Sequence, residues 1–258
     1  MGIFDWLRSP PTCPCSPPAK AWVEERLDWL CEEFPVNIFT GKLLVLPTDE
    51  FFPDVYKGTK DDVENMLRRV CRYMQVDRSR VVLDFMTGGD KSLFVNEKGH
   101  HIAGAGGTYE DAGGYAAIHL DVSELEDPIR VVGTLAHELA HHRLMGEGRV
   151  SGREFDNELL TDLTTVVLGL GLFLASSPRN WRSQYFKWKG TDFNRPEYMS
   201  PPMFGHALAH LAWLENTPRP RWIRHLPYEA RHSLKQAIRY LFETGDSSFT
   251  PQSLREMD

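Results

Sequence analysis

The spacing of apolar residues in the first part of the chain predicts three helices. In the segment 19–34, apolar side chains recur near the helical period and acidic residues separate them. Thr59 opens a second helix, because two aspartates follow it closely and the apolar residues then share one face as far as Met74. Asp127 with Pro128 is a helix-start pattern, and the apolar spacing continues until Gly146. We therefore expect helices over 19–34, 59–74 and 127–145.

Short apolar runs between these helices predict strands. The sequences VNIF and KLLVL, within residues 36–46, are typical of a hairpin that turns at Thr40 and Gly41. Glycine-rich turns separate several of the other strand-like runs. These runs occupy residues 81–86, 93–96, 101–105 and 115–121.

The pattern becomes purely helical beyond the third helix. Helices are expected over 154–175, 201–216 and 227–244, and the loops between them are rich in aromatic residues, proline and arginine. A mixed part followed by a helical part predicts an α+β fold with a cleft where the two parts meet. We expect a flexible lead followed by a single catalytic domain that consists of two subdomains. Their boundaries are 1–18 for the lead, 19–146 for the α+β subdomain and 147–258 for the helical subdomain.

Composition and charge exclude several classes of protein. The chain has 258 residues, 41% of them hydrophobic and 25% charged, as in ordinary soluble domains. A net charge of −7 argues against a general nucleic-acid binder, which would be basic. The first 20 residues lack a signal-peptide pattern, and the uncharged run 163–177 is too short to cross a bilayer. We therefore expect a cytoplasmic protein without membrane or nucleic-acid partners.

Four cysteines are too few for a disulfide-built scaffold. Cys13 and Cys15 form one close pair in a proline-rich segment, whereas a zinc ribbon needs two such pairs. We interpret them as incidental thiols of a flexible lead, with a metal or redox site as the alternative.

The segment His137-Glu138-Leu139-Ala140-His141 carries the main chemical signal. Residues four apart on a helix differ by only about 40° around its axis, so both imidazoles project from one face. Two imidazoles one turn apart can bind one metal ion, and Glu138 can reach a water on that ion as a general base. The alternative is a helix whose histidines merely lie at its surface.

Glu158 and Asp162 supply the groups that such a site still needs. Catalytic zinc usually takes three protein ligands, and these two acids again lie four apart on one predicted helix. Glu158 can be the third ligand while Asp162 accepts the spare ring N–H of a ligand histidine. Acids at an exposed helix start are the alternative, but a strongly apolar segment follows them and favours burial.

HELAH at 137–141 followed by NELLTD at 157–162 resembles the HExxH…ExxxD signature of the gluzincin metallopeptidases, the thermolysin-like clan of zincins. The resemblance implies a zincin-like fold and one Zn²⁺ per chain, held by His137, His141 and Glu158. It also implies Glu138 as general base and Asp162 as support for a histidine. In that clan an edge strand before the active-site helix pairs with extended substrate. Residues 115–121 take the corresponding place, with Ala116 and Ala117 as substrate-binding residues.

A donor to the oxyanion of the tetrahedral intermediate is also needed. Gluzincins take a histidine or tyrosine from the helical part, and this chain offers His206, Tyr198 and His210. We favour His206 first and Tyr198 second, while a histidine that only packs in the core is equally compatible with the pattern. His206 and His210 could also form a second metal pair, but no carboxylate is obvious near them in sequence.

These features predict a zinc metallopeptidase acting on a peptide or protein substrate. The main rival is a non-catalytic zincin fold whose metal stabilises an interaction surface. A protease acting on DNA-bound proteins is a third hypothesis, and the acidic net charge opposes it. Alternating aromatic and basic residues over 181–195 could bind nucleic acid, but we interpret them as a loop packed across the helical part, where it can form one wall of the substrate cleft. The sequence does not determine the substrate or the oligomeric state.

Overall fold

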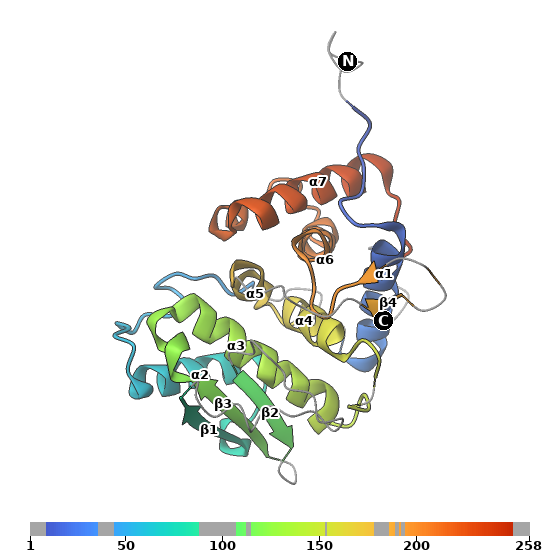
Figure 1. Cartoon of the computed structure of the whole chain (residues 1–258). Helices are drawn as coiled ribbons and strands as arrows, with labels where there is room; N and C mark the ends of the chain where they lie inside the picture. Colours follow the sequence, from blue (N-terminus) through green and yellow to red (C-terminus); the bar gives the residue numbers. More distant parts are fainter. Residues whose placement is uncertain are drawn as a thin grey trace.

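The computed structural model combines seven α-helices with two small sheets among the residues that it describes (Figure 1). Those residues are 9–35, 44–87, 107–111, 115–152, 154–177, 186–188, 191 and 194–249. Helices on one three-stranded sheet agree with the expected α+β class. The predicted strands 93–96 and 101–105, and most of the predicted hairpin 36–46, lie outside the described residues.

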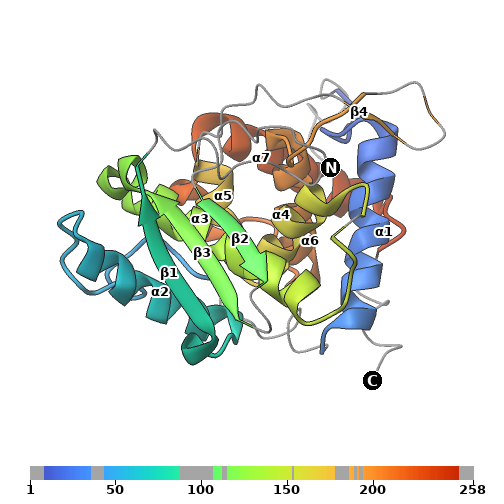
Figure 2. The same cartoon turned by 60° about the horizontal axis from the view of Figure 1, so that its bottom comes forward.

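The main sheet has the strand order β1-β3-β2. Strand β1 (Val81–Met86) runs parallel to β3 (Ala116–Asp121), and β2 (Gly107–Asp111) runs antiparallel to β3 on its other side. Figure 2 shows these three strands side by side, with β3 in the middle. Strands β1 and β3 confirm two predicted runs.

The prediction that residues 115–121 form an edge strand is wrong. Ala116 and Ala117 pair with Val81 and Val82 on one side, and with Asp111 and Glu110 on the other. Their backbone groups are therefore engaged within the sheet. The reason is β2, which pairs with the side of β3 that was expected to be the edge. Strand β2 lies in the glycine-rich region, where no strand was predicted.

Local signals correctly placed the first two helices, α1 (Pro17–Glu33) and α2 (Lys60–Met74). At the start of α2, the Asp62 backbone N–H donates to Thr59 Oγ1 at 3.2 Å, and the Thr59 N–H donates to the Asp62 carboxylate at 3.0 Å. This reciprocal capping satisfies two donors that a helix start leaves unpaired.

The helix with the histidine motif is α3 (Pro128–His141), which continues as a π-helical turn (His142–Gly146). The Asp127 carboxylate accepts hydrogen bonds from the N–H groups of Ile129 at 3.0 Å and Arg130 at 3.2 Å. The predicted cap, proline and end at Gly146 are thus confirmed.

The prediction of one continuous helix over 154–175 is wrong, because the structure has two helices there. The structure has α4 (Asn157–Val167) and α5 (Gly171–Ser176), separated by Gly169 at a φ of 87°. A positive φ is accessible to glycine at little cost and ends the helical hydrogen bonding there. The Gly169 carbonyl accepts the N–H of Val45 at 2.9 Å, so the break joins α4 to an earlier segment.

The C-terminal helices are α6 (Pro201–Leu214) and α7 (Tyr228–Thr244), close to their predicted bounds. Before them, β4 (Phe186–Lys187) and β5 (Asn194–Arg195) form a two-stranded antiparallel ladder. Three 3₁₀ turns complete the regular structure of the described residues, over Arg78–Arg80, Val122–Glu126 and Arg221–His225.

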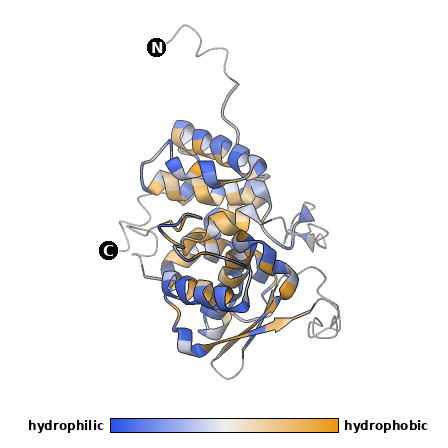
Figure 3. Cartoon of the chain, turned by 90° about the vertical axis from the view of Figure 1, so that its left-hand side faces the viewer, coloured by the Kyte–Doolittle hydropathy of each residue, from blue (hydrophilic) through white to orange (hydrophobic). Residues whose placement is uncertain are grey.

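The helices form successive levels above the sheet. In Figure 1 the sheet lies below α3, then come α4 and α5, and α6 and α7 lie at the far end. In Figure 3 the hydrophobic residues gather at the middle level, in agreement with the complete burial of residues 159–168. No helix among the described residues is long and apolar enough to cross a membrane.

Helix α1 joins the C-terminal helices, because it packs against α4 and α6. Its Arg26 donates two hydrogen bonds to the fully buried Asp156, at 2.8 and 2.9 Å, and Trp22 Nε1 donates a third at 2.6 Å. Asp156 directly precedes α4. Helix α1 thereby positions the start of the helix that carries Glu158.

The expectation of a flexible lead is wrong for residues 9–18. Arg239 on α7 donates to the Ser9 carbonyl at 2.8 Å, and Gln236 donates to the Thr12 carbonyl at 3.2 Å. Helix α1 already begins at Pro17. The proline-rich composition suggested flexibility, but tertiary contacts with α7 hold this segment in place.

Candidate metal centre

Helices α3 and α4 bring the predicted ligands to one point. His137 Nε2 lies 3.1 Å from Glu158 Oε2 and 3.1 Å from His141 Nε2, and His141 Nε2 lies 3.4 Å from the same carboxylate oxygen. The two histidines are almost fully buried, whereas the Glu158 side chain is 30% exposed. One side of the cluster therefore faces solvent.

In each imidazole, Nε2 points into the cluster (the inner nitrogen) and Nδ1 points away from it (the outer nitrogen). The hydrogen-bond partner of Nδ1 determines whether Nε2 carries a hydrogen or a lone pair. His137 Nδ1 lies 3.0 Å from Asp162 Oδ1, so Nδ1 carries the hydrogen. Thr161 Oγ1 donates its hydrogen to the Asn157 carbonyl at 2.8 Å, so it accepts one from His141 Nδ1 at 3.1 Å. In both neutral rings Nε2 then presents a lone pair.

Three electron-pair donors thus face one another: two imidazole nitrogens and a carboxylate oxygen. Such groups repel unless a cation lies between them. Zinc accepts this nitrogen and oxygen donor set at bond lengths of about 2.0–2.2 Å. Donor separations of 3.1–3.4 Å match what a tetrahedral ion with such bonds requires.

Asp162 lies where its predicted supporting role requires. Its second carboxylate oxygen accepts the Met199 N–H at 2.9 Å, and the side chain is fully buried. The carboxylate is therefore fixed from two sides and orients the His137 ring. Thr161 does the same for His141, and sequence reasoning missed it although it lies next to Asp162 on α4.

The charge state of Glu158 depends on the positive charge beside it. When the imidazoles of His141 and His137 are protonated, their charges and hydrogen bonds outweigh the effect of burial and hold the pKa of Glu158 well below its usual range, and a divalent cation between neutral rings would act in the same direction. Glu138, the expected base, is 5% exposed and lies on α3 directly after His137. The carboxylate that binds and the carboxylate expected to act as base thus come from different helices.

Two tyrosines border this cluster. The Tyr198 ring lies 5.9 Å from the His137 ring, and the Tyr109 ring of β2 stacks on His141 at 6.1 Å with an interplanar angle of 19°. Tyr198 is half-buried and precedes α6. Tyr109 had no signal in the sequence, because its strand was not predicted.

Glu197, next to Tyr198 in the chain, also interacts with the cluster. Burial raises the pKa of its carboxyl, and the negative charge of Glu158 raises it further against the opposing charge of Arg195. The segment before α6 therefore lies against a candidate ligand.

The structure does not bring His206 to this cluster, so its predicted role as oxyanion donor is wrong. His206 is fully buried, with Nε2 at 3.1 Å from Glu24 Oε1 and Nδ1 at 3.9 Å from Cys13 Sγ. Both ring nitrogens thus face groups from other parts of the chain. The helical spacing of His206 and His210 was read correctly, but only tertiary packing reveals which way their face points.

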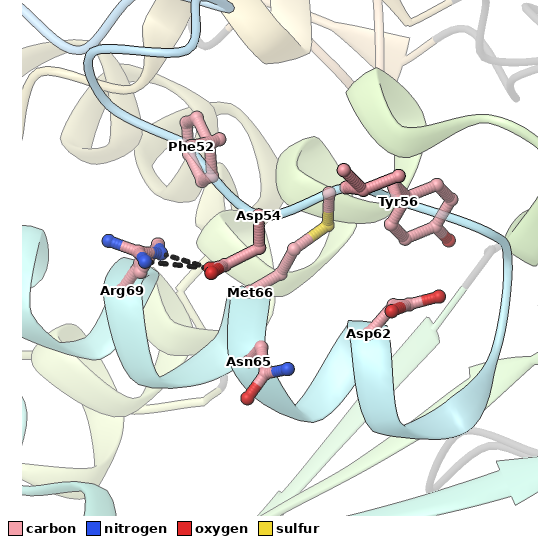
Figure 4. Close-up of a pocket in the computed structure, with 8 residues that line it drawn as sticks. Phe52, Asp54, Tyr56, Asp62, Asn65, Met66 and Arg69 are labelled. Atoms are coloured by element: carbon pink, nitrogen blue, oxygen red, sulfur yellow. Dashed lines mark hydrogen bonds and ion pairs between the residues drawn. The ribbon is translucent and has the colours of Figure 1, made fainter.

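A small surface pocket lies elsewhere, between α2 and the segment before it (Figure 4). Arg69 donates to Asp54 across it at 2.7 Å. Its lining contains no residue of the metal cluster, and we assign it no role. The lining residues are Phe52, Asp54, Val55, Tyr56, Asp62, Asn65, Met66 and Arg69.

No protein-family model, curated protein or solved structure matches this chain.

Proposed function

We propose that this protein is a zinc-dependent peptidase. The observation that carries the proposal is the convergence of His137 Nε2, His141 Nε2 and Glu158 Oε2, all within 4.8 Å of one another, on a partly open point. Structural zinc is normally closed by four protein ligands, and catalytic zinc keeps one position open. Three ligands with one exposed side favour the catalytic arrangement.

A zinc ion held there would polarise a peptide carbonyl and acidify a bound water. Glu138 would take the proton of the attacking water and pass it to the leaving amine. Its carboxylate is only 5% exposed, and in a buried environment its charge acts more strongly on a proton within reach. Asp162 and Thr161 keep both imidazoles in the tautomer whose Nε2 carries the lone pair.

Strand β2 is the part of the sheet that suits an extended substrate. It pairs with β3 on one side, and its other side has no partner strand among the described residues. It also contacts α3, with Tyr109 against His141. A peptide added along β2 would gain backbone hydrogen bonds and pass close to the ligands. This role replaces the one predicted for Ala116 and Ala117.

The direct test is hydrolysis of an unstructured protein such as casein by the full chain. We expect cleavage that a chelator abolishes and that stoichiometric zinc restores, because the water must be activated by the ion. Cleavage products are followed by mass spectrometry. Full activity in a chain shown by elemental analysis to be metal-free would refute the proposal.

Tyr198 is the best-placed oxyanion donor. Replacing Tyr198 with Phe removes one hydroxyl and keeps the ring beside His137, so we expect kcat to fall roughly 10²-fold with little change in KM. The exposed Tyr228 on α7 provides a matched Tyr→Phe control. An unchanged kcat in Tyr198→Phe would remove this residue from the mechanism without affecting the metal assignment.

The rival function, a non-catalytic fold with a metal-stabilised surface, uses the same ligands. The open side of the cluster and the buried acid at position 138 favour the enzyme, because a purely structural site uses neither.

A further inference from the structure

A second group of metal-binding side chains lies outside the proposed active site. It consists of Glu24 on α1 with His206 and His210 on α6, and its ligand atoms all lie within 4.8 Å of one another. Glu24 is 2% exposed and both histidines are fully buried. The two histidines are one helical turn apart, as in the first cluster, and the carboxylate again comes from another helix.

The hydrogen-bond partners of His210 leave its inner nitrogen as an acceptor. Nδ1 lies 2.9 Å from the His206 carbonyl oxygen, so Nδ1 carries the hydrogen and Nε2 the lone pair. Nε2 faces Ser247 Oγ at 2.9 Å, but that hydroxyl donates to the Phe249 carbonyl at 2.7 Å. A hydroxyl has one hydrogen, so Ser247 can satisfy either His210 Nε2 or the Phe249 carbonyl but not both at once.

The two carboxylate oxygens of Glu24 have different neighbours, and only Oε1 faces the histidines. Glu24 Oε2 accepts hydrogen bonds from the Ser248 backbone at 3.0 Å and the Ser248 hydroxyl at 3.1 Å. Oε1 faces His206 Nε2 at 3.1 Å and His210 Nε2 at 3.9 Å. Lys20 Nζ lies 3.1 Å from Oε1 and 3.1 Å from Oε2, so a metal ion bound to Oε1 would replace the ammonium at that oxygen while Oε2 keeps it.

Cys13 gives His206 an outer partner. Its Sγ lies 3.9 Å from His206 Nδ1, within reach of an N–H to sulfur contact. Without a metal ion, the carboxylate at 3.1 Å is the stronger acceptor, so His206 Nε2 carries a hydrogen and donates it to Glu24 Oε1. A metal ion at Nε2 would replace that hydrogen, and Nδ1 would then carry one and donate it to Cys13 Sγ, as the Nδ1 atoms of the first cluster donate to Asp162 and Thr161.

We propose that Glu24, His206 and His210 bind a second divalent metal ion, best matched by zinc, in a structural site. The distances from Glu24 Oε1 to the two Nε2 atoms, 3.1 and 3.9 Å, lie on either side of the roughly 3.4 Å expected between ligands of tetrahedral zinc. Ser247 Oγ is the nearest group for a fourth position. Unlike the first site, this one has no exposed ligand, so no substrate reaches it.

The ion would join three parts of the chain that are far apart in sequence. These are α1, α6 and the segment from Ser247 to Phe249 that follows α7. A ligand that binds only the folded state stabilises it by an amount that grows with the logarithm of the ratio of ligand concentration to Kd. The second site would therefore stabilise the packing of α1 against α6 and the segment after α7. This role does not depend on the peptidase chemistry.

The test uses the full chain with both first-site histidines replaced, His137→Ala with His141→Ala. This double variant is saturated with zinc, passed through a desalting column and analysed for metal per chain. We expect about one equivalent to remain and the Tm to fall when a strong chelator removes it. Adding His210→Ala should abolish the remaining equivalent, whereas adding the exposed His232→Ala on α7 should leave it.

No bound metal in a folded double variant would overturn the proposal and leave Glu24 and His206 as a buried ion pair. If either variant fails to fold by circular dichroism, the unaltered chain decides: two equivalents support the second site and one overturns it. Cobalt substitution checks the ligand set. A thiolate-to-cobalt charge-transfer band would place Cys13 among the ligands and overturn the assignment to nitrogen and oxygen donors.

Discussion

Replacing Glu138 with Gln should reduce kcat for peptide hydrolysis by about 10²–10⁴-fold, because the amide cannot accept the proton of the attacking water. The change is isosteric, and Glu138 is not among the three ligands, so metal content should stay at the level of the unaltered chain. Steady-state kinetics on a cleavable peptide and elemental analysis of the same preparation measure the two quantities together.

Glu154→Gln is the matched control, since Glu154 is exposed and lies a few residues before α4. It should retain full activity and full metal. Normal turnover by Glu138→Gln would exclude Glu138 as the base. Loss of metal along with activity would instead mean that Glu138 helps to hold the ion.

Replacing His141 with Ala should remove the first-site metal and reduce hydrolysis to the uncatalysed background. His137 and Glu158 would remain, but two donors bind zinc far more weakly than three, and Thr161 would lose the imidazole that it orients. The loss should amount to about one metal equivalent per chain. Metal titration of the apo-protein and the casein assay measure the effect.

His232→Ala serves as the control for this experiment as well, because it removes an exposed imidazole from α7. Retention of the first-site equivalent and of activity in His141→Ala would contradict the ligand assignment. If the unaltered chain binds zinc but hydrolyses no peptide, and His141→Ala loses that zinc, the result would favour the non-catalytic rival. The two experiments therefore separate the metal site from the reaction.

Much of the candidate site could be predicted from sequence, because its signals are local. Residues four apart on a helix share a face whatever surrounds that helix, so His137 with His141 and Glu158 with Asp162 could be paired directly. The helix starts at Thr59 and Asp127 were equally local, since each cap satisfies backbone groups within three residues.

The remaining features depend on contacts between distant segments. Strand order is set by which backbones pair across the sheet, so the central position of β3 could not be read from its own residues. Thr161 shares α4 with Glu158, yet its role depends on the neighbouring ring of His141.

The sequence by itself determined most helix bounds, the HExxH motif at 137–141 and the acids that accompany it, since helical geometry converts spacing into proximity. Only the tertiary structure decided that His206 faces Glu24, 182 positions away, and that β2 covers the outer side of β3. A spacing specifies which side chains share a face, but packing of whole elements decides what that face meets.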